Sequence, residues 1–310
     1  MKKVLIPTKL DAQAAKILAD AGYAVVQEPK TPVLDLAKAN ADAYGLIVRS
    51  EKVTPEVMDA LPGLKVVVRA GAGFDNIDCA YARSKGIDVM NTPGANSNAV
   101  AEEVVALILA DCRHVVAADQ TTRQGLWEKS KLMGTELTAK TVGILGFGHI
   151  GRLVAKRISG FECRILAYDP FLSAEQIQAA GAEAATPEDI FAQCDFVTLH
   201  IPQNDQTKGF VGEKLLGLMK NGATLVNCAR AGIVNEEAIR AAKAAKGIRF
   251  LNDVYPKDAE GPKSVTDIAD LMMPHLGAST VEANRNAAIR AAEEIVELNR
   301  DGSSRFIVNK

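Results

Sequence analysis

The chain has 310 residues, of which 48% are hydrophobic, and its formal net charge at pH 7 is −2. This length predicts about two domains, each with an ample apolar core. The near-neutral charge gives no electrostatic basis for binding nucleic acid or an anionic membrane, and no apolar run reaches the roughly 18 residues that a membrane helix needs.

Short apolar runs alternate with helix-forming segments from the N-terminus to about residue 93. The runs are KVLIP, YAVVQ, GLIVRS, KVVVRAG and IDVMNTP. Their β-branched residues and the helical segments between them indicate a parallel sheet with helices on both faces. We expect the first run to be a strand rather than part of a signal peptide, because polar and acidic residues follow it at once.

Residues 99–125 are predicted to form one long helix. Its apolar residues cover more than one helix face, so we expect it to be buried on several sides, in part by a partner subunit. A coiled coil is the alternative, but the apolar repeat is too short for one.

A second α/β unit is predicted from residue 141 onwards. Its strands are VGILG, CRILAYD, FVTLHIP, TLVNCAR, RFLNDVY and LMMPHLG, and their spacing is typical of βαβ units. A final helix at 281–300 is expected to pack back on the first domain. The predicted fold class is therefore α/β, with two doubly wound parallel-sheet domains of Rossmann-like or flavodoxin-like type, comprising residues 1–98 with 282–310 and residues 99–281.

The run VGILGFGHIG holds the most informative motif of the chain, Gly146-x-Gly148-x-x-Gly151, between a predicted strand and a predicted helix. Gly146 suits a tight turn, Gly148 a close approach to a pyrophosphate, and Gly151 close helix–strand packing. The pyrophosphate would bind the free N–H groups at the helix N-terminus. Asp169 ends the next strand, where its carboxylate would bind both ribose hydroxyls and repel a 2′-phosphate. The motif and Asp169 thus predict NAD rather than NADP. The alternative is that the glycines form an ordinary βα turn that binds no cofactor.

Cysteine and histidine usage points to a reducing compartment and to no metal site. The five cysteines are widely spaced and form no CxxC motif, so we expect reduced thiols and a cytoplasmic protein. The four histidines lack zinc-ligand spacing.

Polar groups follow three predicted strands of the second unit: Arg230, the acids Asp258 and Glu260, and His275. Taken singly, each could be a solvated or capping residue. Together they lie where the strand ends of a parallel sheet meet. Histidine titrates near neutral pH and suits proton transfer, a carboxylate can orient it, and a guanidinium can polarise a carbonyl and bind a carboxylate.

Several longer motifs resemble the D-isomer-specific 2-hydroxyacid dehydrogenases, most closely the branch of that family that oxidises phosphoglycerate. They are VRAGAGFDNID, NTPGANSNAVAE, WEKSKLMGTEL, GILGFGHIGRLVA, NCARAGIVNEEA and MPHLGAST, which occur in this order over nearly the whole chain. The resemblance implies a substrate-binding domain (1–98 and 282–310), an NAD-binding domain (99–281), and a cleft between them that closes over the substrate.

The resemblance also implies residue roles. It assigns the catalytic roles to Arg230, Asp258 and His275. Substrate contacts are implied for Arg69, Ala72, Gly73, Arg230 and His275. Cofactor contacts, besides the three glycines and Asp169, are implied for His149, Ile150, His200, Ile201, Pro202, Thr207, Cys228, Ala229, Arg230, Asp253, His275, Gly277 and Ala278.

Two departures from the family pattern affect these expectations. Asp258 stands where the family usually has a glutamate, so its contact with His275 is expected to be longer unless the loop moves inward, and Glu260 is the reserve candidate. The chain also ends after the returning helix, so we expect no serine feedback through a C-terminal regulatory domain.

The expected function is NAD-dependent oxidation of D-3-phosphoglycerate to 3-phosphohydroxypyruvate in serine biosynthesis, by a homodimer. The phosphate-binding candidate is Arg69, with Arg49 and Lys129 by analogy. A first alternative is the same reaction on another short 2-hydroxy acid, such as hydroxypyruvate, glyoxylate or sulfolactate. A second is a non-catalytic NAD-sensing protein like the family's corepressors.

Overall fold

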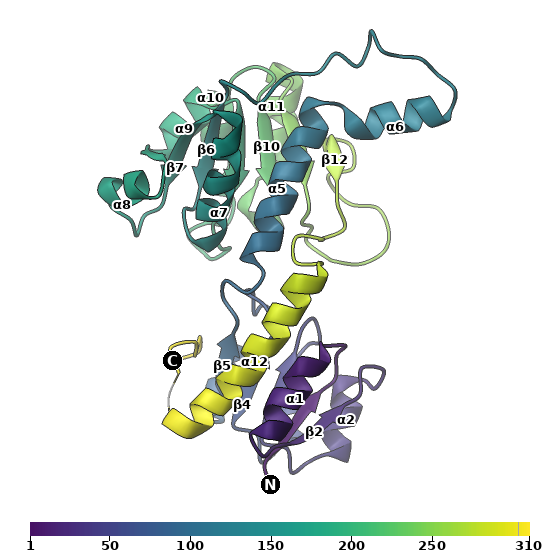
Figure 1. Cartoon of the computed structure of the whole chain (residues 1–310), viewed down its shortest axis with the longest axis vertical. Helices are drawn as coiled ribbons and strands as arrows, with labels where there is room; N and C mark the ends of the chain where they lie inside the picture. The colour runs from purple at the N-terminus through teal and green to yellow at the C-terminus, as the bar shows by residue number, and fades with distance from the viewer. Residues whose placement is uncertain (303) are drawn as a thin grey trace. The chain divides into compact units, whose positions relative to one another are not determined.

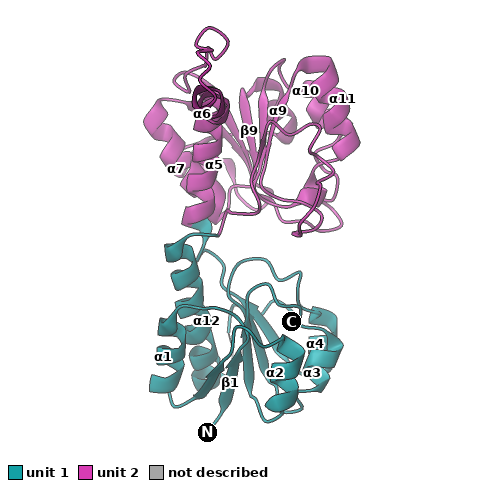
Figure 2. Ribbon diagram, turned by 90° about the vertical axis from the view of Figure 1, so that its right-hand side faces the viewer, with its two compact units in different colours: residues 1–97, 279–310 teal, residues 98–278 magenta. Residues whose placement is uncertain are grey.

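A computed structural model describes residues 1–302 and 304–310 of the chain. The chain divides into two compact units, residues 1–97 with 279–310 (unit 1) and residues 98–278 (unit 2), coloured teal and magenta in Figure 2. The boundaries thus fall at 97/98 and 278/279 rather than at the expected 98/99 and 281/282. No helix among the described residues is both long enough and apolar enough to cross a bilayer.

Unit 1 contains a five-stranded parallel sheet in the order β2-β1-β3-β4-β5, which is a doubly wound arrangement. The strands are β1 (Lys3–Ile6), β2 (Ala24–Gln27), β3 (Gly45–Val48), β4 (Val66–Arg69) and β5 (Asp88–Asn91). The helices are α1 (Ala12–Asp20), α2 (Val33–Ala39), α3 (Pro55–Asp59), α4 (Cys79–Ser84) and α12 (Val281–Asp301).

Helix α12 returns to the first sheet, as expected (Figure 1). Its small and aliphatic residues recur at helical spacing and are buried against β1, β3 and β4, beside α1. These residues are Ala287, Ala288, Ala291, Ala292, Ile295 and Leu298. Alanines at the contact let the helix pack close to its neighbours.

Unit 2 contains a seven-stranded parallel sheet in the order β12-β11-β10-β9-β6-β7-β8. The strands are β6 (Thr141–Leu145), β7 (Arg164–Tyr168), β8 (Glu183–Ala184), β9 (Phe196–Leu199), β10 (Thr224–Asn227), β11 (Arg249–Asn252) and β12 (Leu271–Met272). The strand order reverses between β6 and β9, and ligands of such sheets bind beyond the carboxyl ends of the strands at that point. The predicted fold class is confirmed.

Helices cover both faces of this second sheet (Figure 1). The helices of this part of the chain are α5 (Ser97–Cys112), α6 (Val115–Arg123), α7 (His149–Ile158), α8 (Ala174–Ala179), α9 (Pro187–Gln193), α10 (Glu213–Leu218) and α11 (Glu236–Lys246), with short 3-10 turns η1 (Ser159–Phe161) and η2 (Ala231–Ile233). Of these, α6 extends away from the sheet (Figure 1).

The prediction of one helix over 99–125 is wrong, because the helix breaks at His114, which has a left-handed φ of 50°. The Cys112 carbonyl, which a continuous helix would bond to Val116, instead accepts the N–H of Thr135 at 2.9 Å. Gly134 lies so close that a Cβ there would be 2.3 Å from the same oxygen. The returning loop therefore ends α5, which is buried, whereas α6 buries no residue.

Candidate functional site

Most of the predicted site residues of unit 2 follow the carboxyl ends of its parallel strands. Gly146 follows β6, Asp169 follows β7, His200 follows β9, and Asp253 follows β11. His275 comes three residues after β12. Because all seven strands run parallel, these residues lie along one edge of the sheet, on both sides of the point where the strand order reverses.

The three glycines of the motif after β6 have different surroundings. Gly146 has a φ of +96°, and a Cβ there would be 2.7 Å from the backbone carbonyl of His200. A Cβ at Gly151 would be 2.3 Å from the Gly146 oxygen, so glycine alone allows α7 to pack this close. Gly148 is the N-cap residue of α7, and a Cβ there would meet no atom within 4 Å. The open space in front of the α7 N-terminus fits a pyrophosphate.

Asp169 is oriented by two backbone amides. Its Oδ2 accepts the N–H of Phe147 at 2.9 Å, and its Oδ1 accepts the N–H of Phe171 at 3.0 Å. The glycine loop is also tied to this strand, because Gly146 N–H donates to the Tyr168 carbonyl at 2.8 Å. Each carboxylate oxygen keeps a lone pair for a ribose hydroxyl, so the residues present fit the adenosine half of NAD.

The loop after β9 is held by its own polar contacts. The His200 ring nitrogen Nε2 lies 3.0 Å from Thr198 Oγ1, and burial lowers the pKa of His200 to about 3, so its ring is neutral. Thr207 Oγ1 donates to the Pro202 carbonyl at 2.6 Å. Across the glycine loop, His149 and Ile150 form the first turn of α7. Their role as cofactor contacts stays a prediction.

His275 and Asp258 form the expected imidazole–carboxylate pair, since His275 Nδ1 lies 2.5 Å from Asp258 Oδ2. The shorter aspartate therefore reaches the ring, and the structure pairs the imidazole with Asp258 rather than Glu260. Both side chains are partly exposed, at 42% and 55%. A carboxylate on Nδ1 fixes the tautomer and directs Nε2 to proton transfer.

Arg230 lies in a turn that a buried asparagine supports. Asn227, the last residue of β10, donates from Nδ2 to the Arg230 carbonyl at 3.0 Å and accepts the Ala229 N–H at 3.1 Å. The Arg230 guanidinium donates to the Ala229 carbonyl at 2.7 Å. The guanidinium thus projects from a fixed turn at the same sheet edge as His275.

The structure also reveals Glu103 beside the site, a residue that sequence reasoning missed. Its carboxyl, the Asp253 carboxyl and the Cys228 thiol lie within 4.8 Å of one another. Asp253 in turn accepts the backbone N–H groups of Leu276 at 2.7 Å and Gly277 at 3.0 Å, so it holds the turn that carries His275. The available signal was an acidic residue within the apolar run of α5.

The substrate-binding candidates of unit 1 lie in the loop that follows β4. Arg69 Nε donates to the Arg49 carbonyl at 3.0 Å, and its guanidinium lies over Gly71, where a Cβ would be 1.5 Å from Nη1. Asn91 Nδ2 donates to the Ala72 carbonyl at 2.5 Å, which holds the segment containing Ala72 and Gly73. This half of the predicted site therefore belongs to unit 1, and Arg230 and His275 belong to unit 2.

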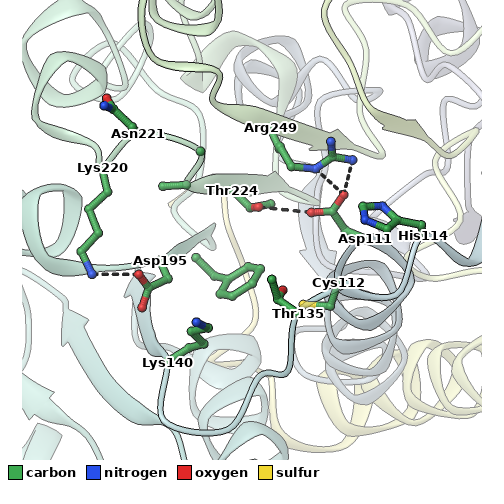
Figure 3. Close-up of a pocket in the computed structure, with 13 residues that line it drawn as sticks. Asp111, Cys112, His114, Thr135, Lys140, Asp195, Lys220, Asn221, Thr224 and Arg249 are labelled. Carbon is green, nitrogen blue, oxygen red and sulfur yellow. Dashed lines mark hydrogen bonds and ion pairs between the residues drawn. The ribbon is translucent and has the colours of Figure 1, made fainter. Parts of the chain in front are cut away.

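A cavity of about 230 Å³ lies at the amino ends of β6, β9, β10 and β11, opposite the edge that holds the predicted site (Figure 3). Asp111 accepts hydrogen bonds there from Arg249 Nε at 2.7 Å and Thr224 Oγ1 at 3.2 Å. Lys220 pairs with Asp195 at 2.8 Å. The charged side chains facing this cavity mostly neutralise one another, and none of them is a predicted site residue.

Comparisons with known proteins identify the family. Residues 105–277 match the family described as D-isomer specific 2-hydroxyacid dehydrogenase, NAD binding domain. The chain is 39% identical to human D-3-phosphoglycerate dehydrogenase over 100% of its own length and 58% of that enzyme. It is 37% identical to the Archaeoglobus fulgidus enzyme of the same name, over 99% of the chain and 59% of that enzyme. The chain thus spans about three fifths of these relatives.

Solved structures agree with this result. The NAD+-bound 3-phosphoglycerate dehydrogenase of Entamoeba histolytica is 33% identical, with a TM-score of 0.82 over 100% of this chain and 99% of that one. A D-2-hydroxyisocaproate dehydrogenase at 22% identity shares the fold, with a TM-score of 0.87 over the full length of both chains. The chain therefore belongs to the D-isomer specific 2-hydroxyacid dehydrogenases, a family of NAD-dependent oxidoreductases.

Proposed function

We propose that this protein oxidises D-3-phosphoglycerate to 3-phosphohydroxypyruvate with NAD, a reaction that supplies serine synthesis. The observation that carries the proposal is the His275–Asp258 pair, which lies at the same sheet edge as the glycine loop and Asp169. The relatives named D-3-phosphoglycerate dehydrogenase, at 37–39% identity over nearly the whole chain, support the choice of substrate.

Cofactor binding is proposed for the carboxyl ends of β6, β7 and β9. The α7 N-terminus would hold the pyrophosphate, Asp169 would bind the ribose of the adenosine half, and the loop from His200 to Pro202 would flank the glycine loop. Near the nicotinamide we place Cys228, Ala229, Arg230, Asp253, His275, Gly277 and Ala278. When bound, NAD accepts a hydride from C2 of the substrate.

Proton transfer is proposed for His275. Its neutral Nε2 takes the hydroxyl proton as the C2 hydrogen leaves with both bonding electrons, so the alcohol becomes a carbonyl and the imidazole becomes a cation. Asp258 stabilises that cation through Nδ1. Arg230 binds the substrate carboxylate and polarises the C2 oxygen by charge-assisted hydrogen bonds. In the reverse reaction the imidazolium returns the proton.

Substrate binding is proposed for the loop after β4. The backbone amides of Ala72 and Gly73 would bind the carboxylate, and Arg69 would bind the phosphate. The guanidinium of Arg69 is held by the Arg49 carbonyl and by its packing over Gly71, which restricts its conformations before a ligand arrives.

The test is NADH formation by the purified protein with NAD and 3-phosphoglycerate, under alkaline conditions that trap the product. We expect turnover, and the proposal is abandoned if none occurs. A panel of hydroxypyruvate, glyoxylate, sulfolactate and lactate then identifies any other preferred acid. Arg69→Ala should lose activity towards phosphorylated acids only. NAD binding without any turnover would favour a sensing role.

We further propose a cytoplasmic homodimer. The cysteines, all of them described, are free thiols, as a reducing compartment requires. Helix α6 and the loop after it expose large apolar side chains, which suit burial by a second copy. They are Val115, Val116, Leu126, Trp127 and Met133, of which Trp127 is 86% exposed. Light scattering after size exclusion should give twice the chain mass, and Trp127→Glu should shift it towards the monomer.

A further inference from the structure

Glu103 is an acidic residue within the apolar helix α5, and it faces the turn that follows His275. Both carboxylate oxygens are buried and have no hydrogen-bond partner among the described residues. A Cβ at Gly277 would lie 3.0 Å from Glu103 Oε2 and 3.3 Å from Asp253 Oδ2. The two carboxyls therefore pack directly against the backbone beside the proposed catalytic histidine.

The protonation of these carboxyls decides whether the arrangement is stable. Two ionised carboxylates offer only acceptors, so they repel one another and neither can donate to the other, while the Cys228 thiol beside Glu103 is only a weak donor. One proton on Glu103 turns the two groups into a hydrogen-bond donor and an acceptor. Burial, and then the negative charge of Asp253, raise the pKa of Glu103 to about 8. The Cys228 thiol adds no charge at neutral pH, because burial raises its pKa well above its usual value.

We propose that Glu103 carries a proton that it shares with Asp253, and that this carboxyl pair positions the His275 turn for the reaction. Asp253 then keeps lone pairs for the amides of Leu276 and Gly277, which it accepts at 2.7 and 3.0 Å. These bonds hold the turn in which His275 adopts a φ of 57°, a conformation that costs energy for a residue with a side chain.

The other ionisable groups that face the pair are Cys228, His275 and Tyr255. Burial raises the pKa of Asp253 overall, although the backbone amides of Leu276 and Gly277 and the charge of His275 lower it. Burial and the Asp253 charge raise the pKa of Tyr255, so its phenol is neutral under working conditions. With one shared proton the pair carries one negative charge, and it gains a second as Glu103 loses its proton near pH 8. The positioning role rests on the proposed function, whereas the shared proton is a property of the protein without substrate.

Infrared spectroscopy of the ligand-free protein tests the proton. We expect a carbonyl stretch of a protonated, buried carboxyl at pH 6 that titrates with a midpoint of about 8 and is missing in Glu103→Gln. Glu294→Gln is the matched control, because Glu294 also has buried oxygens without a hydrogen-bond partner among the described residues and burial raises its pKa to about 8, although its Oε1 lies 3.3 Å from Arg290 Nε. The control should remove a separate band and leave that of Glu103. The proposal is overturned if Glu103→Gln removes no band, or if the purified protein holds one zinc ion that this variant loses.

Kinetics test the positioning role. Glutamine keeps a donor for Asp253 but cannot ionise, whereas leucine offers no donor. At pH 6 we expect kcat of Glu103→Gln to exceed that of Glu103→Leu by about tenfold or more. The ratio of wild-type to Glu103→Gln kcat should fall as the pH rises through about 8. A ratio that is constant with pH overturns the positioning role. Lack of turnover in the wild-type protein would instead refute the proposed function and leave the infrared result intact.

Discussion

Two glycines, Gly148 at the N-cap of α7 and Gly151 within that helix, allow cofactor binding to be separated from folding. Gly148 has a φ of −74° and a ψ of −152°, which alanine can adopt, and a Cβ there meets no atom within 4 Å. A Cβ at Gly151 would be 2.3 Å from the Gly146 carbonyl oxygen and 3.1 Å from Ile144 Cγ2. We therefore expect Gly148→Ala to weaken cofactor binding and Gly151→Ala to weaken folding.

The magnitudes follow from these distances. Ordinary contact begins at 3.4 Å, so alanine at 151 overlaps a backbone atom by about 1 Å. Overpacking costs up to about 3 kcal/mol, and the better helix propensity of alanine offsets about 1 kcal/mol of it. A net loss of about 2 kcal/mol lowers the Tm by about 4–8 °C. Gly148→Ala should change stability by less than about 1 kcal/mol. Its methyl group occupies the proposed pyrophosphate position and should weaken NADH binding about 10- to 100-fold.

Thermal unfolding without cofactor and fluorescence titration with NADH measure the two effects. Gly160→Ala is the matched control, since a Cβ there also meets nothing within 4 Å and Gly160 lies outside the proposed site, so neither quantity should change. The reasoning is refuted if Gly148→Ala binds NADH as tightly as the wild type, or if Gly151→Ala is as stable as the wild type.

Five further substitutions, grouped in three experiments, test the site and the electrostatics of the fold. His275→Ala should lower kcat about 10²-fold or more, Asp258→Asn less, and Glu260→Gln least; initial-rate kinetics would contradict the observed pairing if Glu260 mattered more than Asp258. Asp169→Ala should weaken NAD binding and improve the relative use of NADP, measured by titration with both, because the lost charge no longer repels a 2′-phosphate. Burial raises the pKa of Glu294 from 4.5 to about 8, so its stabilising proton is fully bound below about pH 4.5 and is lost as the pH rises through about 8. Between pH 4.5 and 8 unfolding releases that proton, so the free energy of unfolding falls by at most about 1.4 kcal/mol per pH unit. Glu294→Gln should flatten this slope in urea unfolding at pH 5, 6 and 7. An unchanged slope would contradict the raised pKa of Glu294.

Local patterns predicted most of the fold. The apolar runs located the strands of both sheets except β8, whose two residues, Glu183 and Ala184, are exposed and give no apolar signal. The end of α5 could not be predicted, because its apolar pattern continues through Val115 and Val116. The helix ends there because the backbone N–H of the distant Thr135 donates to the Cys112 carbonyl.

The candidate site divides in the same way. The glycine motif was predictable because it depends on local geometry. Gly146 has a positive φ, and a Cβ at Gly151 would collide with the nearby Gly146 carbonyl oxygen. The reach of Asp258 to His275 was not predictable, since it depends on the path of the loop between β11 and β12. Glu103 was missed because its partner Asp253 is 150 residues away along the chain.

The amino-acid sequence by itself determined the strand–glycine–helix unit, the polar residues that follow the parallel strands, and the family. These features could be predicted because short-range sterics and apolar periodicity depend on residues close together in the chain. Only the tertiary structure decided which acid meets the imidazole, where α5 stops, and which carboxyls are buried together. Those features depend on burial and on contacts between segments far apart in the chain. The free energy of such contacts arises only when the segments meet in the folded protein.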